Sequence, residues 1–177
     1  MRSPIRSNNP IDQTKMKTRN SREEDIAVLT IIDMQARFPS SQNNATIAGV
    51  LRLIAYAIAR NWPVIVIEFY AHGPTDERIM EMLRNYERCV IVFKFAEDGS
   101  EELWEACVEH ELPGNRFVVC GVNTHACVKE TVHGMARLMP DSAIEVVKNA
   151  CNCQTNHGWN DFQLPNKNVF LSNTFPV

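Results

Sequence analysis

Three reactive side chains each follow an apolar run that is typical of a buried strand. Asp33 closes the run IAVLTII, Lys94 closes the run VIVF, and Cys127 follows the run FVVC within the stretch GVNTHACVK. Each residue also fits an ordinary role, because an aspartate often caps a turn, a lysine can extend to water, and a free cysteine is usually a small core side chain. Together, an acid, a cation and a thiol could form a cysteine nucleophile with a base and a charged partner.

Strands and helices alternate among the predicted elements that must position these side chains. Apolar, β-branched runs predict strands at residues 26–32, 64–69, 90–93, 117–120, 143–147 and 169–171. Helical spacing of apolar residues predicts helices at 47–58, 75–84 and 101–109, a fourth from near residue 124 to 138, and a fifth near 156–162. This alternation predicts a single three-layer α/β domain, with a mostly parallel sheet and helices on both faces.

The carboxyl ends of parallel strands lie at one edge of a sheet, where the chemistry of such folds gathers. We therefore expect Asp33, Lys94 and Cys127 to converge there. If a helix begins near Thr124, the Cys127 thiol lies in its first turn, where unpaired amides and the helix dipole favour an anion. A nearby lysine would lower the thiol pKa further, from about 8.5 toward neutrality. The same amides could stabilise an oxyanion.

The bulk properties are those of an ordinary globular domain. The chain has 177 residues, of which 45% are hydrophobic and 22% charged, and its net charge of -3 gives no electrostatic reason to expect nucleic acid. No apolar run approaches membrane-spanning length, and the apolar core of a secretory signal is missing. A domain of this size needs no disulfides, so the six cysteines predict reduced intracellular thiols, and Cys151-Asn-Cys153 lacks zinc-finger spacing.

The positive charge is concentrated at the amino terminus. Residues 1–22 carry six basic side chains and one acidic side chain, a charge of +5, so the remainder of the chain carries -8. Polar composition without apolar periodicity predicts a disordered basic arm over residues 1–24, with the globular domain at residues 25–177.

Two motifs carry a resemblance to a known family. The stretch IIDMQARF at residues 31–38 resembles the IDMQ..F opening of the isochorismatase-like cysteine hydrolase superfamily, which includes nicotinamidase-like amidohydrolases. The stretch GVNTHACV at residues 121–128 is similar to the family's nucleophile motif GvxTxxCV, and Lys94 falls where the family lysine is expected. KNAC at residues 148–151, followed by His157, is similar to a weaker DaC…h motif in which Asn149 replaces the usual Asp. The resemblance covers residues 25–172 and implies a Rossmann-like fold.

The resemblance also implies roles for individual residues. Asp33 would be the base, Lys94 the charged member and Cys127 the nucleophile of a catalytic triad. Family members carry a cis peptide at the bond that matches Val122–Asn123, which makes the backbone amides of Asn123 and Cys127 the oxyanion hole. Four further side chains are expected to line the substrate pocket: Gln35, Phe38, Tyr70 and His125.

The cysteine narrows the reaction that the resemblance implies. Isochorismatases that cleave a vinyl ether generally lack it, so Cys127 favours hydrolysis of a small amide or carbamoyl-type C–N bond through a thioester. Nicotinamidases also bind a metal through Asp and His residues after the second strand. Glu68, His72 and Asp76 are of suitable types here, but the D-x-H pattern is absent and Tyr70 stands where a histidine is expected. We therefore expect no metal and no cofactor.

Two other functions remain open at this point. The chain could be a non-catalytic binding or scaffold protein, because a triad does not ensure a competent pocket. Alternatively, Cys127 could be an oxidisable thiolate with Cys120 or Cys151 as its resolving cysteine. By analogy with the family, we expect a cytoplasmic homo-oligomer, a dimer or larger, that takes a small-molecule substrate and has neither nucleic acid nor membrane as a partner. The sequence does not identify the substrate.

Overall fold

The computed structural model describes residues 26–154, 159 and 162–173. The predicted arm at residues 1–24 lies outside this part of the chain, as does most of the helix predicted near residues 156–162. The strands are β1 (Val28–Ile32), β2 (Val64–Phe69), β3 (Cys89–Lys94), β4 (Arg116–Val122), β5 (Ala143–Asn152) and β6 (Val169–Ser172). The helices are α2 (Asn44–Ala59), α3 (Glu77–Leu83), α4 (Ser100–Glu109) and α5 (Lys129–Leu138), with short helical turns η1 (Pro39–Gln42) and η2 (Thr124–Val128).

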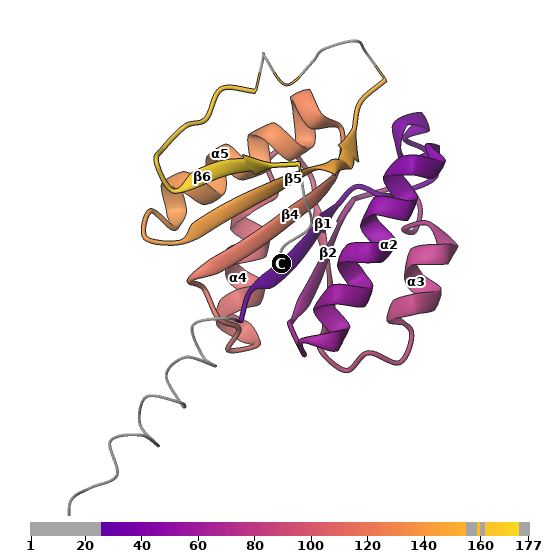
Figure 1. The fold of residues 1–177 in the computed structure, drawn as a ribbon, viewed down its shortest axis with the longest axis horizontal. Coiled ribbons are helices and arrows are strands. Elements are labelled where there is room, and N and C mark those ends of the chain that lie inside the picture. The colour runs from indigo at the N-terminus through magenta and orange to yellow at the C-terminus, as the bar shows by residue number, and fades with distance from the viewer. Residues whose placement is uncertain (1–25, 155–158, 160–161, 174–177) are drawn as a thin grey trace, which may run out of the picture.

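The six strands form one sheet in the order β3-β2-β1-β4-β5-β6, and every neighbouring pair is parallel (Figure 1). The predicted parallel α/β architecture is confirmed. The chain moves outward from β1 to β3, then returns to β4 on the other side of β1, so the strand order reverses between β1 and β4. In open parallel sheets, ligands bind beside the carboxyl ends of the strands at such a reversal.

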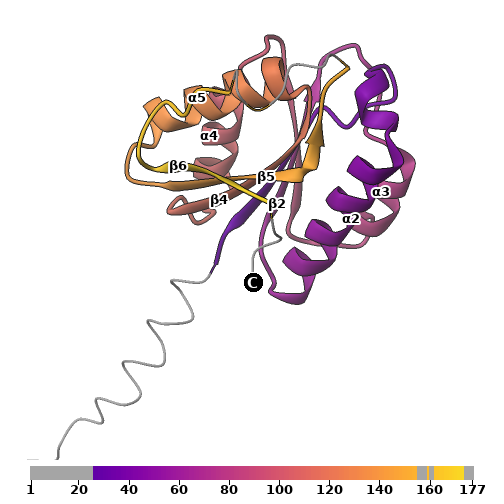
Figure 2. The ribbon, with the colours of Figure 1, turned by 45° about the horizontal axis from the view of Figure 1, so that its top comes forward.

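Helices cover both faces of the sheet, as predicted, and each face has its own apolar core (Figure 2). On one face, α2 and α3 contribute Leu53 and Ile79 to a core with Leu29. On the other face, α4 and α5 contribute Leu103 and Met135 to a second core. Strands covered on both faces carry apolar side chains in both directions, which explains their continuous apolar runs.

The ends of the predicted elements differ from the observed ones where polar side chains intervene. The helix predicted from residue 75 begins at Glu77, because the Asp76 side chain caps it by accepting from the Arg78 N–H. Thr75 instead forms an isolated antiparallel bridge with Gln35. Strand β4 continues two residues past Cys120, and β5 runs to Asn152 rather than residue 147.

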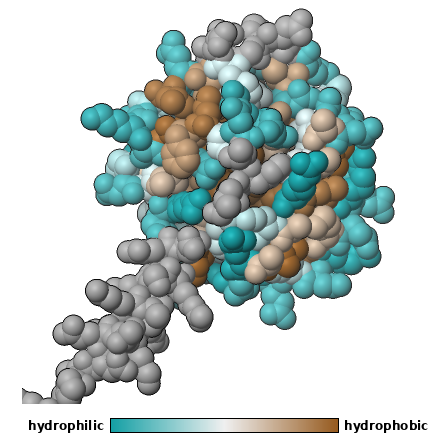
Figure 3. Space-filling model, viewed as in Figure 1, coloured by the Kyte–Doolittle hydropathy of each residue, from teal (hydrophilic) through white to brown (hydrophobic). Residues whose placement is uncertain are grey.

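The molecular face in Figure 3 is largely hydrophilic, with hydrophobic residues gathered in patches between hydrophilic ones. None of the helices in the described part of the chain combines the length and the apolar character needed to cross a bilayer.

Candidate active site

Asp33, Lys94 and Cys127 meet at the carboxyl edge of the sheet. Asp33 follows β1, Lys94 ends β3, and Cys127 lies in η2 directly after β4. The Lys94 Nζ atom lies 3.0 Å from Asp33 Oδ2, and both side chains are 0% exposed. The Cys127 thiol lies close enough to both of them for each to shift its pKa, and the residue is 4% exposed. The convergence expected from the sequence is therefore observed as a buried acid, cation and thiol in mutual contact.

The backbone at Asp33 turns sharply out of the strand. Asp33 has φ 52°, in the left-handed region that non-glycine residues seldom adopt. Its N–H still donates to Ile67 O at 2.9 Å, so the residue stays tied to β2. Such a conformation costs about 1–3 kcal/mol, and neighbouring contacts must hold it.

A loop after β3 holds the Lys94 ammonium. Lys94 Nζ donates to Glu97 O at 2.8 Å. The Thr131 hydroxyl, on α5, donates to the same carbonyl oxygen at 3.3 Å and accepts from the Gly99 N–H at 3.0 Å. A Cβ on Gly99 would lie 2.9 Å from Lys94 Cδ, so the loop packs directly on the lysine stem. Thr131 was missed by sequence reasoning, because a single threonine within a helix gives no distinguishing signal.

Two features of the β4–η2 connection place the cysteine. Gly121 has φ 127°, and a Cβ there would lie 2.0 Å from Ile32 O, so only glycine lets β1 and β4 approach this closely. The Val122–Asn123 peptide bond is cis, as the resemblance implied. Asn123 O accepts from the N–H groups of Ala126 and Val128, both at 3.1 Å. These bonds close the π-helical turn that presents Cys127.

The protonation of the site differs from the expectation. Burial, and after it the Asp33 charge, raise the pKa of Cys127 to about 12, although Lys94 acts in the opposite direction. The expected lowering toward neutrality is therefore wrong, because desolvation and the carboxylate outweigh the lysine. Burial also raises the pKa of Asp33 above its usual range, against the lowering effect of Lys94. A protonated thiol that contacts a buried, more basic carboxylate is the resting arrangement.

The four residues expected around the pocket have different surroundings. The Gln35 side chain is buried, with Nε2 donating to Phe69 O at 3.0 Å and Oε1 accepting from the Phe69 N–H at 2.8 Å. Gln35 therefore fastens the loop after β1 to the end of β2. His125 is half-buried in η2, two residues before the cysteine. Tyr70 is 58% exposed and its ring lies 4.9 Å from that of Phe95.

An aromatic cluster stands close to the triad. The Phe38 and His72 rings are stacked, with centroids 4.9 Å apart, and Phe69 contacts the same imidazole edge-on at 4.8 Å. The Lys94 ammonium lies 5.2 Å from the Phe69 ring centroid, and the His72 charge lowers the Asp33 pKa. Phe38 and His72 therefore stand near the charged groups, where they can contact a bound substrate.

The residues at the end of β2 and directly after it do not fit a metal site. The Glu68 carboxylate accepts from the Thr75 N–H at 2.7 Å, and the Asp76 carboxylate caps α3 and pairs with Arg78 at 2.8 Å. The His72 Nδ1 atom contacts Tyr70 O at 3.0 Å. Within the described residues, no group of three or more His, Cys, Asp or Glu side chains could hold a metal ion. The carboxylates that the sequence offered as ligands stabilise local backbone instead.

Comparison with protein families gives a match to the isochorismatase domain over residues 27–162, most of the chain. The chain belongs to the isochorismatase family. Its members share the hydrolase fold that the motifs at residues 31–38 and 121–128 indicated. No curated protein matches the sequence.

Several solved structures share the fold at low sequence identity. The MAR1 ribonuclease from Caenorhabditis elegans has a TM-score of 0.64 and 23% identity, covering 77% of this chain and 68% of that one. The nicotinamidase SaPncA from Staphylococcus aureus has a TM-score of 0.62 and 14% identity, with 73% and 86% covered. An isochorismatase from Pseudomonas putida has a TM-score of 0.58 and 19% identity, with 81% and 80% covered. The three proteins are named for different reactions, so the shared fold alone does not identify the reaction of this chain.

Proposed function

We propose that this isochorismatase-family protein hydrolyses a small amide or carbamoyl-type C–N bond, with Cys127 as the nucleophile and a thioester as the intermediate. The observation that carries the proposal is the buried Asp33–Lys94 ion pair beside the Cys127 thiol. A thiol that only filled the core would have no need of an acid and a cation beside it, since burying charges is costly.

The first half of the reaction makes the thioester. The Cys127 sulfur attacks the substrate carbonyl carbon while Asp33 takes the thiol proton, because a thiol with a pKa of about 12 must lose that proton during attack. The raised pKa of Asp33 makes the carboxylate a stronger base for this step. The C–N bond then breaks, and the proton on Asp33 passes to the leaving nitrogen, which departs as ammonia or an amine.

The second half returns the enzyme to its resting state. Asp33 removes a proton from a water molecule that attacks the thioester carbonyl, and the C–S bond breaks. The sulfur regains the proton from Asp33, and the acid product leaves. Lys94 stays charged throughout and holds the carboxylate in place. We assign the backbone amides of Asn123 and Cys127 to the oxyanion of both tetrahedral intermediates.

The position of Cys120, one of the two candidate resolving cysteines, does not support a thiol-redox role, whereas the other candidate, Cys151, packs against both cores. Cys120 packs in the core on the α2 side of the sheet, whereas Cys127 packs in the core on the α4 and α5 side. A disulfide requires Cα atoms within about 7 Å and Cβ atoms that face one another, which residues on opposite faces of a sheet do not offer. None of the six cysteines, all of which lie in the described part of the chain, forms a disulfide.

The substrate that we propose is a small amide other than nicotinamide. The neighbouring structures named as nicotinamidases give the C–N bond as a precedent, but the residues after β2 lack the ligand set for a metal. The aromatic side chains of Phe38 and His72 favour a substrate with a planar group beside the scissile carbonyl.

An ammonia-release screen tests the proposal. Wild-type protein is incubated with nicotinamide and with carbamoyl and ureido amides, alongside the variants Cys127→Ser and Cys107→Ser. Cys107 is the matched control, because it is a buried cysteine of the same core that lies on α4. We expect at least one amide to be hydrolysed by the wild type and by Cys107→Ser. The kcat/KM of Cys127→Ser for that amide should be more than tenfold below the wild-type value, a loss of at least about 1.4 kcal/mol of transition-state stabilisation. If Cys127→Ser keeps more than a tenth of the wild-type kcat/KM, the nucleophile is another residue.

A further inference from the structure

The edge strand β3 leaves apolar side chains and backbone groups uncovered. Within the described strands it is hydrogen-bonded to β2 alone and lies at the end of the sheet. Ile91 and Phe93 on this strand are 42% and 53% exposed, and Phe95, the residue after it, is 70% exposed. An uncovered edge strand presents N–H and C=O groups that can pair with another extended segment.

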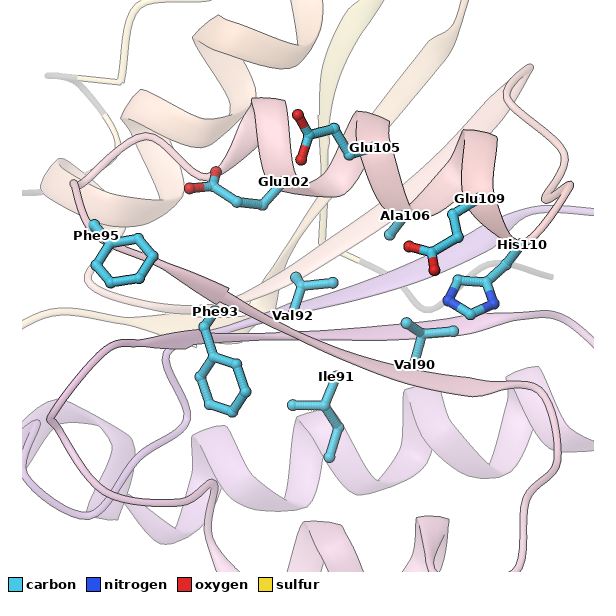
Figure 4. Close-up of a pocket in the computed structure, with 10 residues that line it drawn as sticks. All are labelled: Val90, Ile91, Val92, Phe93, Phe95, Glu102, Glu105, Ala106, Glu109 and His110. Carbon is cyan, nitrogen blue, oxygen red and sulfur yellow. The ribbon is translucent and has the colours of Figure 1, made fainter.

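A groove runs along this edge between β3 and α4 (Figure 4). It encloses about 430 Å³, and Val90 and Val92 point into it while Ile91 and Phe93 point away from α4. A second hollow of about 210 Å³ shares Val90 and His110 with the first, so the groove continues past the amino-terminal end of β3. The groove therefore has the length of the whole strand.

The charged side chains that line the groove are mostly acidic. Within the described part of the chain, no ion pair neutralises the carboxylates that α4 contributes, which are those of Glu102, Glu105 and Glu109. The second hollow adds Glu87 and Glu111 and one basic residue, Arg88, whose guanidinium donates to Asn61 O at 2.7 Å. The surface is thus suited to an extended segment that carries positive charge on one face.

The same charges disfavour a second copy at this edge. Two β3 strands paired antiparallel about a twofold axis would place both α4 helices side by side on one face of the joined sheet. The two rows of glutamates would then face each other, and like charges placed opposite one another are destabilising. A basic occupant is therefore favoured.

The chain contains such a segment outside the described residues. In Thr14-Lys15-Met16-Lys17-Thr18-Arg19, basic residues alternate with Thr and Met, and no proline interrupts the run. Because successive side chains of a strand point to opposite faces, all three basic residues would share one face. The stretch of chain from residue 19 to residue 26, where the described domain starts, spans at most roughly 23 Å when fully extended. The edge beyond β3 is three strand spacings from β1, about 14 Å, so the segment can reach it.

We propose that residues 14–19 of the same chain bind this groove as a seventh strand, antiparallel to β3. The basic face lies toward the glutamates of α4, and Met16 lies beside the exposed ring of Phe93. In this orientation Arg19 lies at the amino-terminal end of β3, nearest the start of β1, which is the end that the chain must reach.

Limited trypsin digestion of the full chain at low ionic strength tests this docking. Trypsin cleaves after Lys15, Lys17 and Arg19, and Arg6 is an internal control outside the segment. We expect cleavage at the three docked sites to be slower than after Arg6 by about tenfold, the factor that a shift of 1.4 kcal/mol produces. The triple variant Glu102→Gln/Glu105→Gln/Glu109→Gln should remove the protection, whereas Glu101→Gln, an exposed change on α4 outside the groove, should not. Equal cleavage rates at all sites in the wild type would overturn the proposal.

A second measurement leaves the folded domain untouched. Replacing Lys15, Lys17 and Arg19 with Gln should raise hydrogen exchange of the β3 amides, and the control Arg2→Gln/Arg6→Gln should not. Unchanged exchange in the triple Gln variant would contradict the docking. The protection should also be independent of protein concentration, because the segment belongs to the same chain. Protection that rises with concentration would assign the groove to a second copy and overturn the proposal.

Discussion

Replacing Lys94 with methionine tests the buried ion pair on which the proposed chemistry depends. The Lys94 ammonium lies 3.0 Å from the Asp33 carboxylate, and neither side chain is exposed. Methionine fills the volume that the Gly99 loop packs against but removes the charge. Breaking a buried pair on one side leaves an uncompensated charge and costs about 3–5 kcal/mol. For a domain of this size, each kcal/mol lowers Tm by about 2–4 °C, so we expect a decrease of about 6–20 °C.

The pH dependence of that loss has a defined sign. Burial already raises the folded-state pKa of Asp33, and removing Lys94 removes the cation that lowers it. A carboxyl whose pKa is higher in the folded state favours folding below its unfolded pKa, about 3.9, and loses that contribution as pH rises through the folded pKa. The stability deficit of Lys94→Met should therefore be small near pH 4 and large at pH 7.

Thermal unfolding of the variants at both pH values gives the test. The double variant Asp33→Asn/Lys94→Met removes both charges and should recover most of the stability at pH 7, since an apolar replacement of both partners is often neutral. A loss below about 1 kcal/mol in the single variant, the range of exposed ion pairs, would show that the pair is solvated. A double variant as unstable as the sum of the single variants would also refute the reasoning.

Three further predictions concern the same site. Thr131→Val removes the hydroxyl that holds the Glu97 carbonyl and the Gly99 amide. The kcat/KM for the amide found by the screen should therefore fall about tenfold, the effect of one lost buried hydrogen bond. Thr131→Ser should keep normal activity, and normal activity in Thr131→Val would contradict a positioning role for this residue. Because the Cys127 pKa is raised to about 12, its alkylation by iodoacetamide should rise about tenfold per pH unit from pH 7 to pH 10, and a plateau below pH 8 would indicate a thiolate in the resting enzyme. Chelator treatment should leave hydrolysis unchanged, and activity lost in chelator and restored by a divalent ion would contradict the ligand geometry after β2.

The fold was largely predictable because local patterns agree with the overall architecture. The run Val64–Phe69 consists of apolar and β-branched residues apart from Glu68, and the predicted strand coincides with β2. The reactive residues were predictable for the same reason, since each follows an apolar run and parallel strands bring their carboxyl ends together. Asp33 and Lys94 lie far apart in the sequence, yet the order of the predicted strands implied that their side chains would meet.

Properties that depend on burial and on long-range contacts were not predictable. The thiol pKa is set by desolvation and by the nearby carboxylate, whereas its place at a helix start suggested the opposite direction. Gln35 was expected to line the pocket, and nothing in the sequence indicated that its amide also holds the backbone at Phe69. The contact of Thr131 with the loop after β3 joins positions more than thirty residues apart, and no periodicity encodes it.

Acyl transfer to hydroxylamine tests the central claim most directly. A thioester on Cys127 reacts with hydroxylamine as well as with water, so the amide identified by the screen should give a hydroxamate in addition to the acid. We predict that the ratio of hydroxamate to acid rises in proportion to hydroxylamine concentration, without any decrease in the rate of ammonia release, and that Cys127→Ser forms neither product at a comparable rate. Acid as the sole product at every hydroxylamine concentration, or hydroxamate formed equally well by Cys127→Ser, would contradict a thioester on this cysteine.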